Sequence, residues 1–261
     1  MNSITIQKQW QKVGQKKVPE TDAIFDQLKI SHDEASQDPA TLRVSLDAKA
    51  TVNVGEFSRG GKSRVETRGL DHDFKPDAHV TPVGILLPEL DELTISGVTS
   101  KVTADCLVDC IESWWDGTKH RFEHIKTLLM NLDNGPECHS RRTQFMHRMV
   151  QFAEKAKLTI RLAYYPPYHS KYNPVERCWG ILEKHWNGSL LDTVHTVIQF
   201  ASTMTWKGIH PVVKLVTNVY QTGVSLTKAA MNEIEARVQR LPKLEKWFVE
   251  IKPSSCMPLD N

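Results

Sequence analysis

The chain has 261 residues, 40% of them hydrophobic and 25% charged, so it has an ordinary globular composition and enough length for one sizeable core. Its formal net charge of +2 is far from the strongly basic balance of many nucleic-acid binders, so any surface for nucleic acid has to be local. Five cysteines without paired CxxC spacing argue against a disulfide framework or a structural zinc site, and no apolar run is long enough to cross a membrane. We therefore expect a cytoplasmic protein with free thiols.

The first 48 residues contain a polar lead-in followed by a buried strand. Residues 1–40 are rich in charged and polar side chains, with one short amphipathic helix predicted at about 21–28. The apolar run LRVSLDA then predicts a strand over 41–48 that ends at Asp47. Apolar and polar residues alternate on either side of SRGGKS, which indicates a hairpin with a basic tip. The tip lacks the GxxxxGK[ST] spacing of a P-loop, so nucleotide hydrolysis is not supported.

The middle of the chain supplies the rest of a sheet and two helices. Short strands at 83–87 and 92–97, together with the strand that ends at Asp47, predict an antiparallel meander. Residues 102–115 have the spacing of an amphipathic helix that covers the sheet. The apolar segment 124–133 predicts a central strand, which Asn134-Gly135-Pro136 breaks directly after Asp133. A helix over 141–155 begins beside this break.

A fifth strand at 158–164 leads into the most informative stretch, YHSKYNPVERCWGILEKHW. Asn173 suits an N-cap and Pro174 suits the first position of a helix, which places Glu176 in the first turn. A Glu at this position often only caps the helix, so a capping role and a functional role both stay open.

The predicted elements therefore place three carboxylates at the ends of strands and at the start of a helix. Asp47 and Asp133 each lie at the carboxyl end of an apolar strand, and Glu176 lies at the mouth of a helix. Side chains that leave neighbouring strands converge on one crevice in open α/β sheets, so the three can meet. Clustered carboxylates repel one another unless cations neutralise them, and oxygen ligands suit Mg²⁺ or Mn²⁺. The sequence thus predicts a metal site.

The segments SLDAK, NLDNGPEC and HSKYNPVERCW, in this order, resemble the DDE transposases of the RNase H-like superfamily. Within it the chain is most similar to the ISAzo-type group of bacterial insertion sequences, which are related to mariner-like elements. The similarity runs from about Lys17 to Pro253 and includes KKVPETDAIF, VTPVGILLPELDEL, SKVTADCLVDCIESWW and TWKGIHPVV.

The resemblance implies an α/β fold, with an RNase H-like mixed five-stranded sheet flanked by helices and an additional C-terminal helical portion. It divides the chain into a lead-in at 1–40, a catalytic core at 41–188, a helical extension packed on the core at 189–252 and a disordered tail at 253–261. The family carries a helix-turn-helix region upstream of this core. We expect that region to be absent here, which makes the chain a truncated transposase or catalytic domain.

The resemblance also implies a chemistry, in which Asp47, Asp133 and Glu176 are catalytic residues that hold two Mg²⁺ ions, with Mn²⁺ as a substitute. The expected reaction is cleavage of transposon-end DNA followed by transfer of the 3′-hydroxyl into target DNA. The expected partners are transposon ends, target DNA and further copies of the chain, as a homodimer or higher oligomer on DNA. No membrane and no nucleotide cofactor are expected, and the protein is expected at the bacterial nucleoid.

A set of basic and histidine side chains follows as candidates for DNA contact, although each is also compatible with an ordinary solvated surface residue: Arg59, Lys62, Arg64, Arg141, Arg142, His169 and Arg177. Two other functions stay open. One is an RNase H-like nuclease without strand transfer. The other is an inactive relic or DNA-binding module that keeps the fold.

Overall fold

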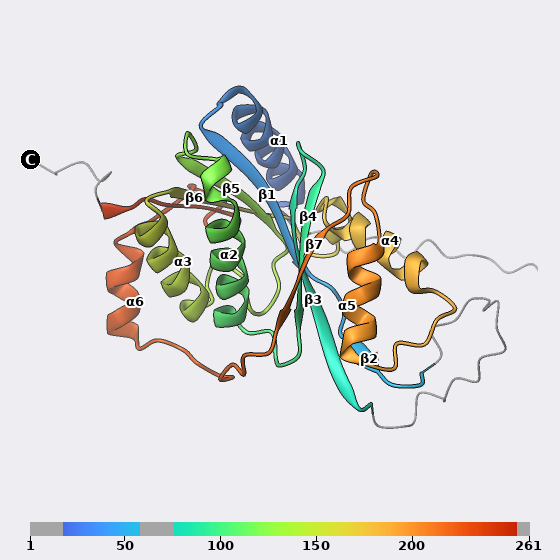
Figure 1. The fold of residues 1–261 in the computed structure, drawn as a ribbon. Coiled ribbons are helices and arrows are strands. Elements are labelled where there is room, and N and C mark those ends of the chain that lie inside the picture. Colours follow the sequence, from blue (N-terminus) through green and yellow to red (C-terminus); the bar gives the residue numbers. More distant parts are fainter. Residues whose placement is uncertain (1–17, 58–75, 255–261) are drawn as a thin grey trace, which may run out of the picture.

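The computed structural model describes residues 18–57 and 76–254 (Figure 1). The predicted basic tip with Arg59, Lys62 and Arg64 lies outside the described residues, as does nearly all of the predicted disordered tail. The helices are α1 (Thr21–Gln37), α2 (Ala104–Thr118), α3 (Thr143–Ala156), α4 (Glu176–Trp186), α5 (Val194–Thr203) and α6 (Lys228–Glu235), with short 3-10 turns η1 (Lys119–Arg121) and η2 (Ser170–Tyr172). The strands are β1 (Thr41–Ala48), β2 (Val52–Val54), β3 (Ala78–Leu87), β4 (Glu92–Val98), β5 (Thr127–Leu132), β6 (Thr159–Tyr164), β7 (Val212–Val216), β8 (Val238–Arg240) and β9 (Phe248–Ile251).

The strands form one mixed sheet in the order β7-β4-β3-β1-β5-β6-β9-β8, with β2 paired to β3. At its centre β1 pairs antiparallel with β3 and parallel with β5, while β4 and β6 continue the two halves. The predicted antiparallel meander and the two later strands are therefore present, flanked by helices. The sheet is larger than the five strands expected, because β7 extends one edge and β9 and β8 extend the other.

Strand β1 lies at the centre of the sheet, and its side chains point alternately to the two faces. Ser45 and Asp47 point to one face, where they hydrogen-bond to residues in and just before α4. Helix α1 lies on this same face, because His32 and Arg43 both hydrogen-bond to Asn131 of β5. The helices α2, α3 and α6 cover the opposite face (Figure 1). The face with α1 and α4 therefore carries the polar side chains of the central strands.

Two parts of the prediction require correction. Helix α1 continues to Gln37, well beyond the expected end near residue 28, and stops where the Asp38 carboxylate accepts hydrogen bonds from Ala40 N and the Thr41 hydroxyl. The region after residue 189 is less helical than predicted: the apolar spacing over 228–241 predicts one helix, but α6 ends at Glu235 and the strand β8 follows. In both cases contacts with distant segments outweigh the local pattern, since β8 is held by pairing with β9. Within the described ranges, no helix is long and apolar enough to span a membrane.

Candidate active site

The structure brings the three predicted carboxylates together at the carboxyl ends of the central strands β1 and β5. Asp47 is the next-to-last residue of β1 and only 7% exposed, Asp133 directly follows β5, and Glu176 is the first residue of α4. Because β1 and β5 are parallel neighbours, with Ser45 opposite Asn131, both aspartates leave the sheet at the same end. Glu176 lies near enough to repel both of them electrostatically.

Burial and mutual repulsion change the acidity of the two aspartates. Burial, followed by the charge of Asp133, raises the pKa of Asp47 to about 7. Burial, followed by the charge of Glu176, also raises the pKa of Asp133, although a hydrogen bond from the Cys138 thiol opposes the shift. A neighbouring cation would relieve both penalties. In the described part of the chain, no group of three His, Cys, Asp or Glu side chains is close enough to hold one ion together. The carboxylates thus share one site without forming a closed coordination shell.

One oxygen of Asp47 is held by a tryptophan that the sequence did not mark as important. The indole Nε1 of Trp179, on α4, donates a hydrogen bond of 2.7 Å to Asp47 Oδ2. Gly84 makes room for this ring, because it lies opposite Asp47 on β3 and a Cβ there would approach Trp179 Cη2 to 2.5 Å. The indole therefore fixes the direction of the carboxylate and opposes its rise in pKa.

A buried hydrogen-bond network joins β1 to the start of α4. The Ser45 hydroxyl donates to Asn173 Oδ1 at 2.6 Å and accepts from Val175 N at 3.0 Å, and Asn173 Nδ2 donates to Leu46 O at 2.9 Å. Ser45 and Asn173 are both fully buried. The network ties the strand that carries Asp47 to the segment that carries Glu176.

The predicted N-cap role of Asn173 is therefore wrong. Helix α4 begins at Glu176 after Val175, and the residue at its N-cap position, Val175, makes no side-chain capping hydrogen bond. The side chain of Asn173 is engaged with β1 instead, because the corner before the helix packs directly on that strand. A polar Ser45 within the apolar run LRVSLDA, two residues before Asp47, was the signal in the sequence for this network.

The other predicted residues have different surroundings. Arg141 and Arg177 are exposed, while Arg142 is half-buried, with its guanidinium 3.5 Å from Glu137. His169 is only 3% exposed, and its Nδ1 lies 2.8 Å from Pro167 O. Its ring packs edge-on against Phe25, with centroids 5.4 Å apart, and is stacked on Tyr172. His169 is thus a packed residue of the corner before α4, with little surface for a DNA contact.

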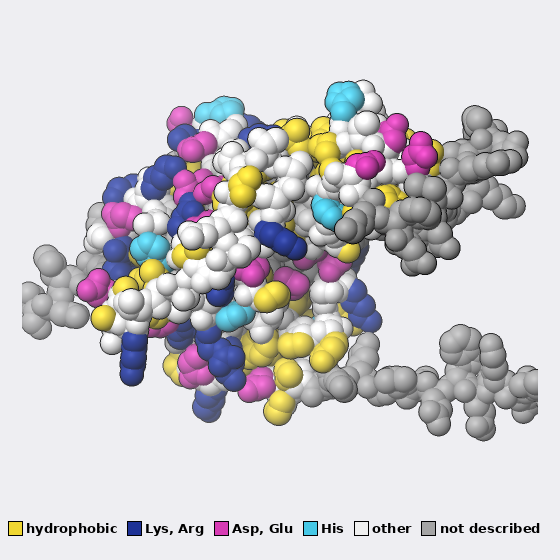
Figure 2. Space-filling view, turned by 90° about the horizontal axis from the view of Figure 1, so that it is seen from below, with side chains coloured by type: hydrophobic (Ala, Val, Ile, Leu, Met, Phe, Trp, Pro, Cys, Tyr) yellow, Lys and Arg dark blue, Asp and Glu magenta, His cyan; other side chains and the backbone are white. Residues whose placement is uncertain are grey.

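The charged side chains form no large surface of one sign on the face seen in Figure 2. Lys and Arg alternate there with Asp and Glu over the body of the molecule. This mixture agrees with the small net charge and with the expectation that a nucleic-acid surface is local.

Comparisons with known proteins place this geometry in a family. The family described as the Rhodopirellula transposase DDE domain matches residues 2–253. Among solved structures, the Mos1 mariner paired end complex with Mn is similar with a TM-score of 0.50 and 9% identity, over 75% of this chain and 57% of that chain. The Mos1 transposase paired-end complex with left transposon end has a TM-score of 0.49 and 10% identity, over 75% of this chain and 57% of that chain.

The chain thus spans little more than half the length of these Mos1 chains. At 9% identity, the similarity to the Mos1 complex with Mn shows a shared fold alone. This fold agrees with the predicted mixed sheet flanked by helices. No curated protein matches the sequence significantly. The family match covers nearly the whole chain and includes all three carboxylate motifs, and the chain therefore belongs to the family of DDE transposase domains.

Proposed function

We propose that this chain is the catalytic domain of a transposase, which cleaves DNA phosphodiester bonds at transposon ends and joins the freed 3′-hydroxyl to target DNA. The observation that carries the proposal is the convergence of Asp47, Asp133 and Glu176 from two parallel strands and one helix, in a chain of the DDE transposase family. Family membership supports transposition chemistry in general. Cleavage, strand transfer and the choice of metal are the parts that need experiments.

The carboxylates fit a divalent metal ion by their chemistry. Asp47 and Asp133 both have raised pKa values because negative charge is concentrated beside them in a buried place, and all three groups offer oxygen ligands. We propose that Asp47, Asp133 and Glu176 hold two Mg²⁺ ions, with Mn²⁺ as a substitute. When bound there, the ions would supply Lewis-acid activation of the attacking oxygen and charge stabilisation of the leaving oxygen in an in-line displacement. One of the similar Mos1 structures is a paired end complex with Mn, which supports this class of ion.

The remaining residues of the site position the carboxylates. Trp179 holds Asp47 through a hydrogen bond to Oδ2, which fixes the orientation of this carboxylate. The contacts of Ser45 and Asn173 keep the corner before α4 on β1, so Glu176 stays at the same edge as the two aspartates. Preorganisation of this kind reduces the movement that is needed during the reaction.

The proposed partners are transposon-end DNA and target DNA, with the chain acting as a homodimer or higher oligomer at the bacterial nucleoid. The similar Mos1 mariner structure is a paired end complex, which supports transposon ends as partners. Arg141 and Arg177 are exposed near the carboxylate motifs and are the described candidates for backbone contact. The core at 41–188 would contain the whole catalytic site, and the region 189–252 would complete the sheet.

The proposal is tested by cleavage and metal binding together. Asp133→Asn and Glu176→Gln should each abolish Mn²⁺-dependent nicking of plasmid DNA and weaken Mn²⁺ binding measured by calorimetry. Both variants should keep the circular dichroism spectrum and unfolding midpoint of the wild type. Asp116→Asn, an exposed carboxylate on α2, is the matched control and should change neither property.

Three outcomes decide between the functions that the sequence left open. Nicking that survives in Asp133→Asn would remove Asp133 from the site. Nicking by the wild type without joined DNA products would favour a nuclease without strand transfer. A wild type that binds no Mn²⁺ and cuts no DNA would favour an inactive relic.

A further inference from the structure

A second concave site lies beside the segment that carries Glu176, on the same face of the sheet. It is a pocket of about 550 Å³, within the size range of ligand sites. Its walls come from α1, from the turn between β3 and β4, from the corner before α4 and from the turn at Trp206-Lys207. Glu176 itself does not line the pocket, although its neighbours in the chain, Pro174 and Arg177, do. The pocket is therefore adjacent to the carboxylates and separate from them.

Two walls of this pocket each present an aromatic ring with a lysine beside it. Tyr172 is 48% exposed, and Lys171 Nζ lies 5.3 Å from the centre of its ring. Trp206 also lines the pocket, and Lys207 Nζ lies 5.8 Å from the centre of its ring. Aromatic rings stack a nucleobase, and a cation beside them attracts its phosphate. Lys207 is itself paired with Asp91, so the cation for the phosphate has to come from elsewhere in the lining.

The turn that carries Trp206 is held in one conformation. Trp206 and Ile209 exchange two backbone hydrogen bonds of 2.9 Å, and the residues between them, Lys207 and Gly208, have φ of +46° and +87°. Positive φ at both central positions is the signature of a tight hairpin turn. A salt bridge of 2.8 Å from Lys207 to Asp91 ties this turn to the end of β3 and β4. The aromatic wall is therefore preformed.

The charges around the pocket favour an anion. Its two carboxylates, Asp33 and Asp91, are each neutralised by a lysine, Lys29 and Lys207. Arg177 remains as a cation that has no carboxylate partner in residues 18–57 and 76–254. The lining thus offers a guanidinium together with two aromatic side chains, Tyr172 and Trp206.

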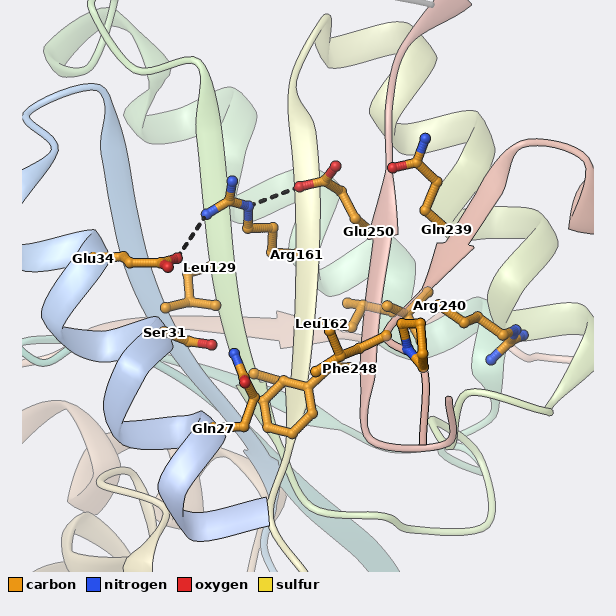
Figure 3. A pocket seen from close by; sticks show the side chains of 14 residues that line it. Gln27, Ser31, Glu34, Leu129, Arg161, Leu162, Gln239, Arg240, Phe248 and Glu250 are labelled. Carbon is orange, nitrogen blue, oxygen red and sulfur yellow. Dashed lines mark hydrogen bonds and ion pairs between the residues drawn. The ribbon is translucent and has the colours of Figure 1, made fainter. Parts of the chain in front are cut away.

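Another pocket on the same face is a useful contrast. It lies between α1 and the β8–β9 hairpin and is lined by Gln27, Ser31 and Phe248, among others (Figure 3). Its Arg161 is held between Glu34, at 3.5 Å, and Glu250, at 2.8 Å, as the dashed lines in Figure 3 mark. The guanidinium is thus already neutralised, and this pocket has no equivalent of the free Arg177.

We propose that the pocket between Tyr172, Trp206 and Arg177 binds one nucleotide unit, with the base against the aromatic rings and the phosphate at the guanidinium. The inference rests on the proposed function for the source of the ligand, which is an unpaired nucleotide of a DNA strand or a free nucleotide. Because Tyr172, Pro174 and Arg177 belong to the same corner as Glu176, an occupied pocket braces the segment that positions this carboxylate.

Binding is measured by calorimetry in the presence of EDTA, so that cleavage plays no part. The probes are deoxythymidine 5′-monophosphate, deoxythymidine, inorganic phosphate and a short single-stranded oligodeoxynucleotide. The monophosphate should bind about tenfold or more tightly than either the nucleoside or phosphate alone, since both halves of the site contribute. If the oligonucleotide binds more tightly than the monophosphate, and Tyr172→Leu weakens its binding, the natural ligand is a nucleotide of a DNA strand. If the two bind equally tightly, the natural ligand is a free nucleotide.

The variants separate stacking from charge. Tyr172→Leu and Trp206→Leu should each weaken monophosphate binding by about tenfold, and Trp206→Phe should largely restore it because a ring face remains. Tyr168→Leu, an exposed aromatic outside the pocket, should leave binding unchanged. Arg177→Gln should weaken binding, whereas Arg161→Gln should not.

The inference is overturned if phosphate binds as tightly as the nucleotide, or if folded Tyr172→Leu and Trp206→Leu proteins bind like the wild type. Its failure is distinguishable from a failure of the proposed function. Lost nucleotide binding with retained Mn²⁺-dependent cleavage rejects only the pocket. Retained nucleotide binding without any cleavage supports the pocket and rejects only the catalytic role.

Discussion

Replacing Asn173 by Ala tests whether the corner before α4 is held to β1 by this one side chain. The change removes the acceptor of the 2.6 Å hydrogen bond from Ser45 and the donor of the 2.9 Å hydrogen bond to Leu46 O. Each bond contributes about 1 kcal/mol net, and a buried group left without a partner costs about 1–3 kcal/mol more. Since Asn173 is fully buried and water does not replace the amide, we expect the free energy of unfolding to fall by about 2–5 kcal/mol.

The loss is measured by urea unfolding, with Asn187→Ala as the matched control. Asn187 is exposed at the other end of α4, so its replacement should change the free energy of unfolding by no more than about 0.5 kcal/mol. At temperatures where the variant is still folded, Asn173→Ala should also nick DNA more slowly than the wild type. The reason is that the segment with Glu176 is no longer hydrogen-bonded through this side chain to the strand with Asp47. Equal stability of the Asn173 and Asn187 variants would refute the reasoning.

Three further changes test other parts of the fold. Gly84→Ala should cost about 1–3 kcal/mol by overpacking against Trp179, whereas Gly180→Ala, which meets nothing within 4 Å, should be neutral or slightly stabilising in urea unfolding. Burial, followed by the charge of Arg43, lowers the pKa of His32 from 6.5 to about 4, so the neutral ring stabilises the fold above pH 6.5. As the pH drops from 6.5 to 4, the free energy of unfolding of the wild type should therefore decrease relative to that of His32→Gln, while the raised pKa of Asp47 acts in the opposite direction in both proteins. Arg148→Met should lower the free energy of unfolding by about 1–3 kcal/mol, because Asp105 and Asp109 of α2 lose their partner. Added salt should reduce the difference in melting temperature between this variant and the wild type.

Several features of the fold were predictable because they depend on short stretches of sequence. The apolar run that becomes β5 is broken by Asn134-Gly135-Pro136, and the apolar run that becomes β1 ends at the charged Asp47, so the positions of Asp47 and Asp133 could be predicted. Proline at 174 likewise marked the beginning of α4 to within two residues. The predicted mixed sheet and helices follow from the same local patterns.

Other features depended on partners distant in sequence. A helix over 228–241 was expected from periodicity, yet its last part pairs with β9 and becomes β8, because a free strand edge was available there. His169 was a candidate for DNA contact, but it is buried, with Phe25 of α1 packed against its ring from more than a hundred residues away in the sequence. No local pattern contains this information.

The sequence by itself determined the three carboxylates, the elements that bear them and the family to which the chain belongs, because these depend on motifs and on strand and helix periodicity. Only the tertiary structure decided how the carboxylates are held. The hydrogen bond from Trp179 to Asp47, the space at Gly84 and the amide of Asn173 on β1 all join segments that are separated by many residues. Such contacts form only when burial has brought the segments together, and buried polar groups then require partners that the final packing provides.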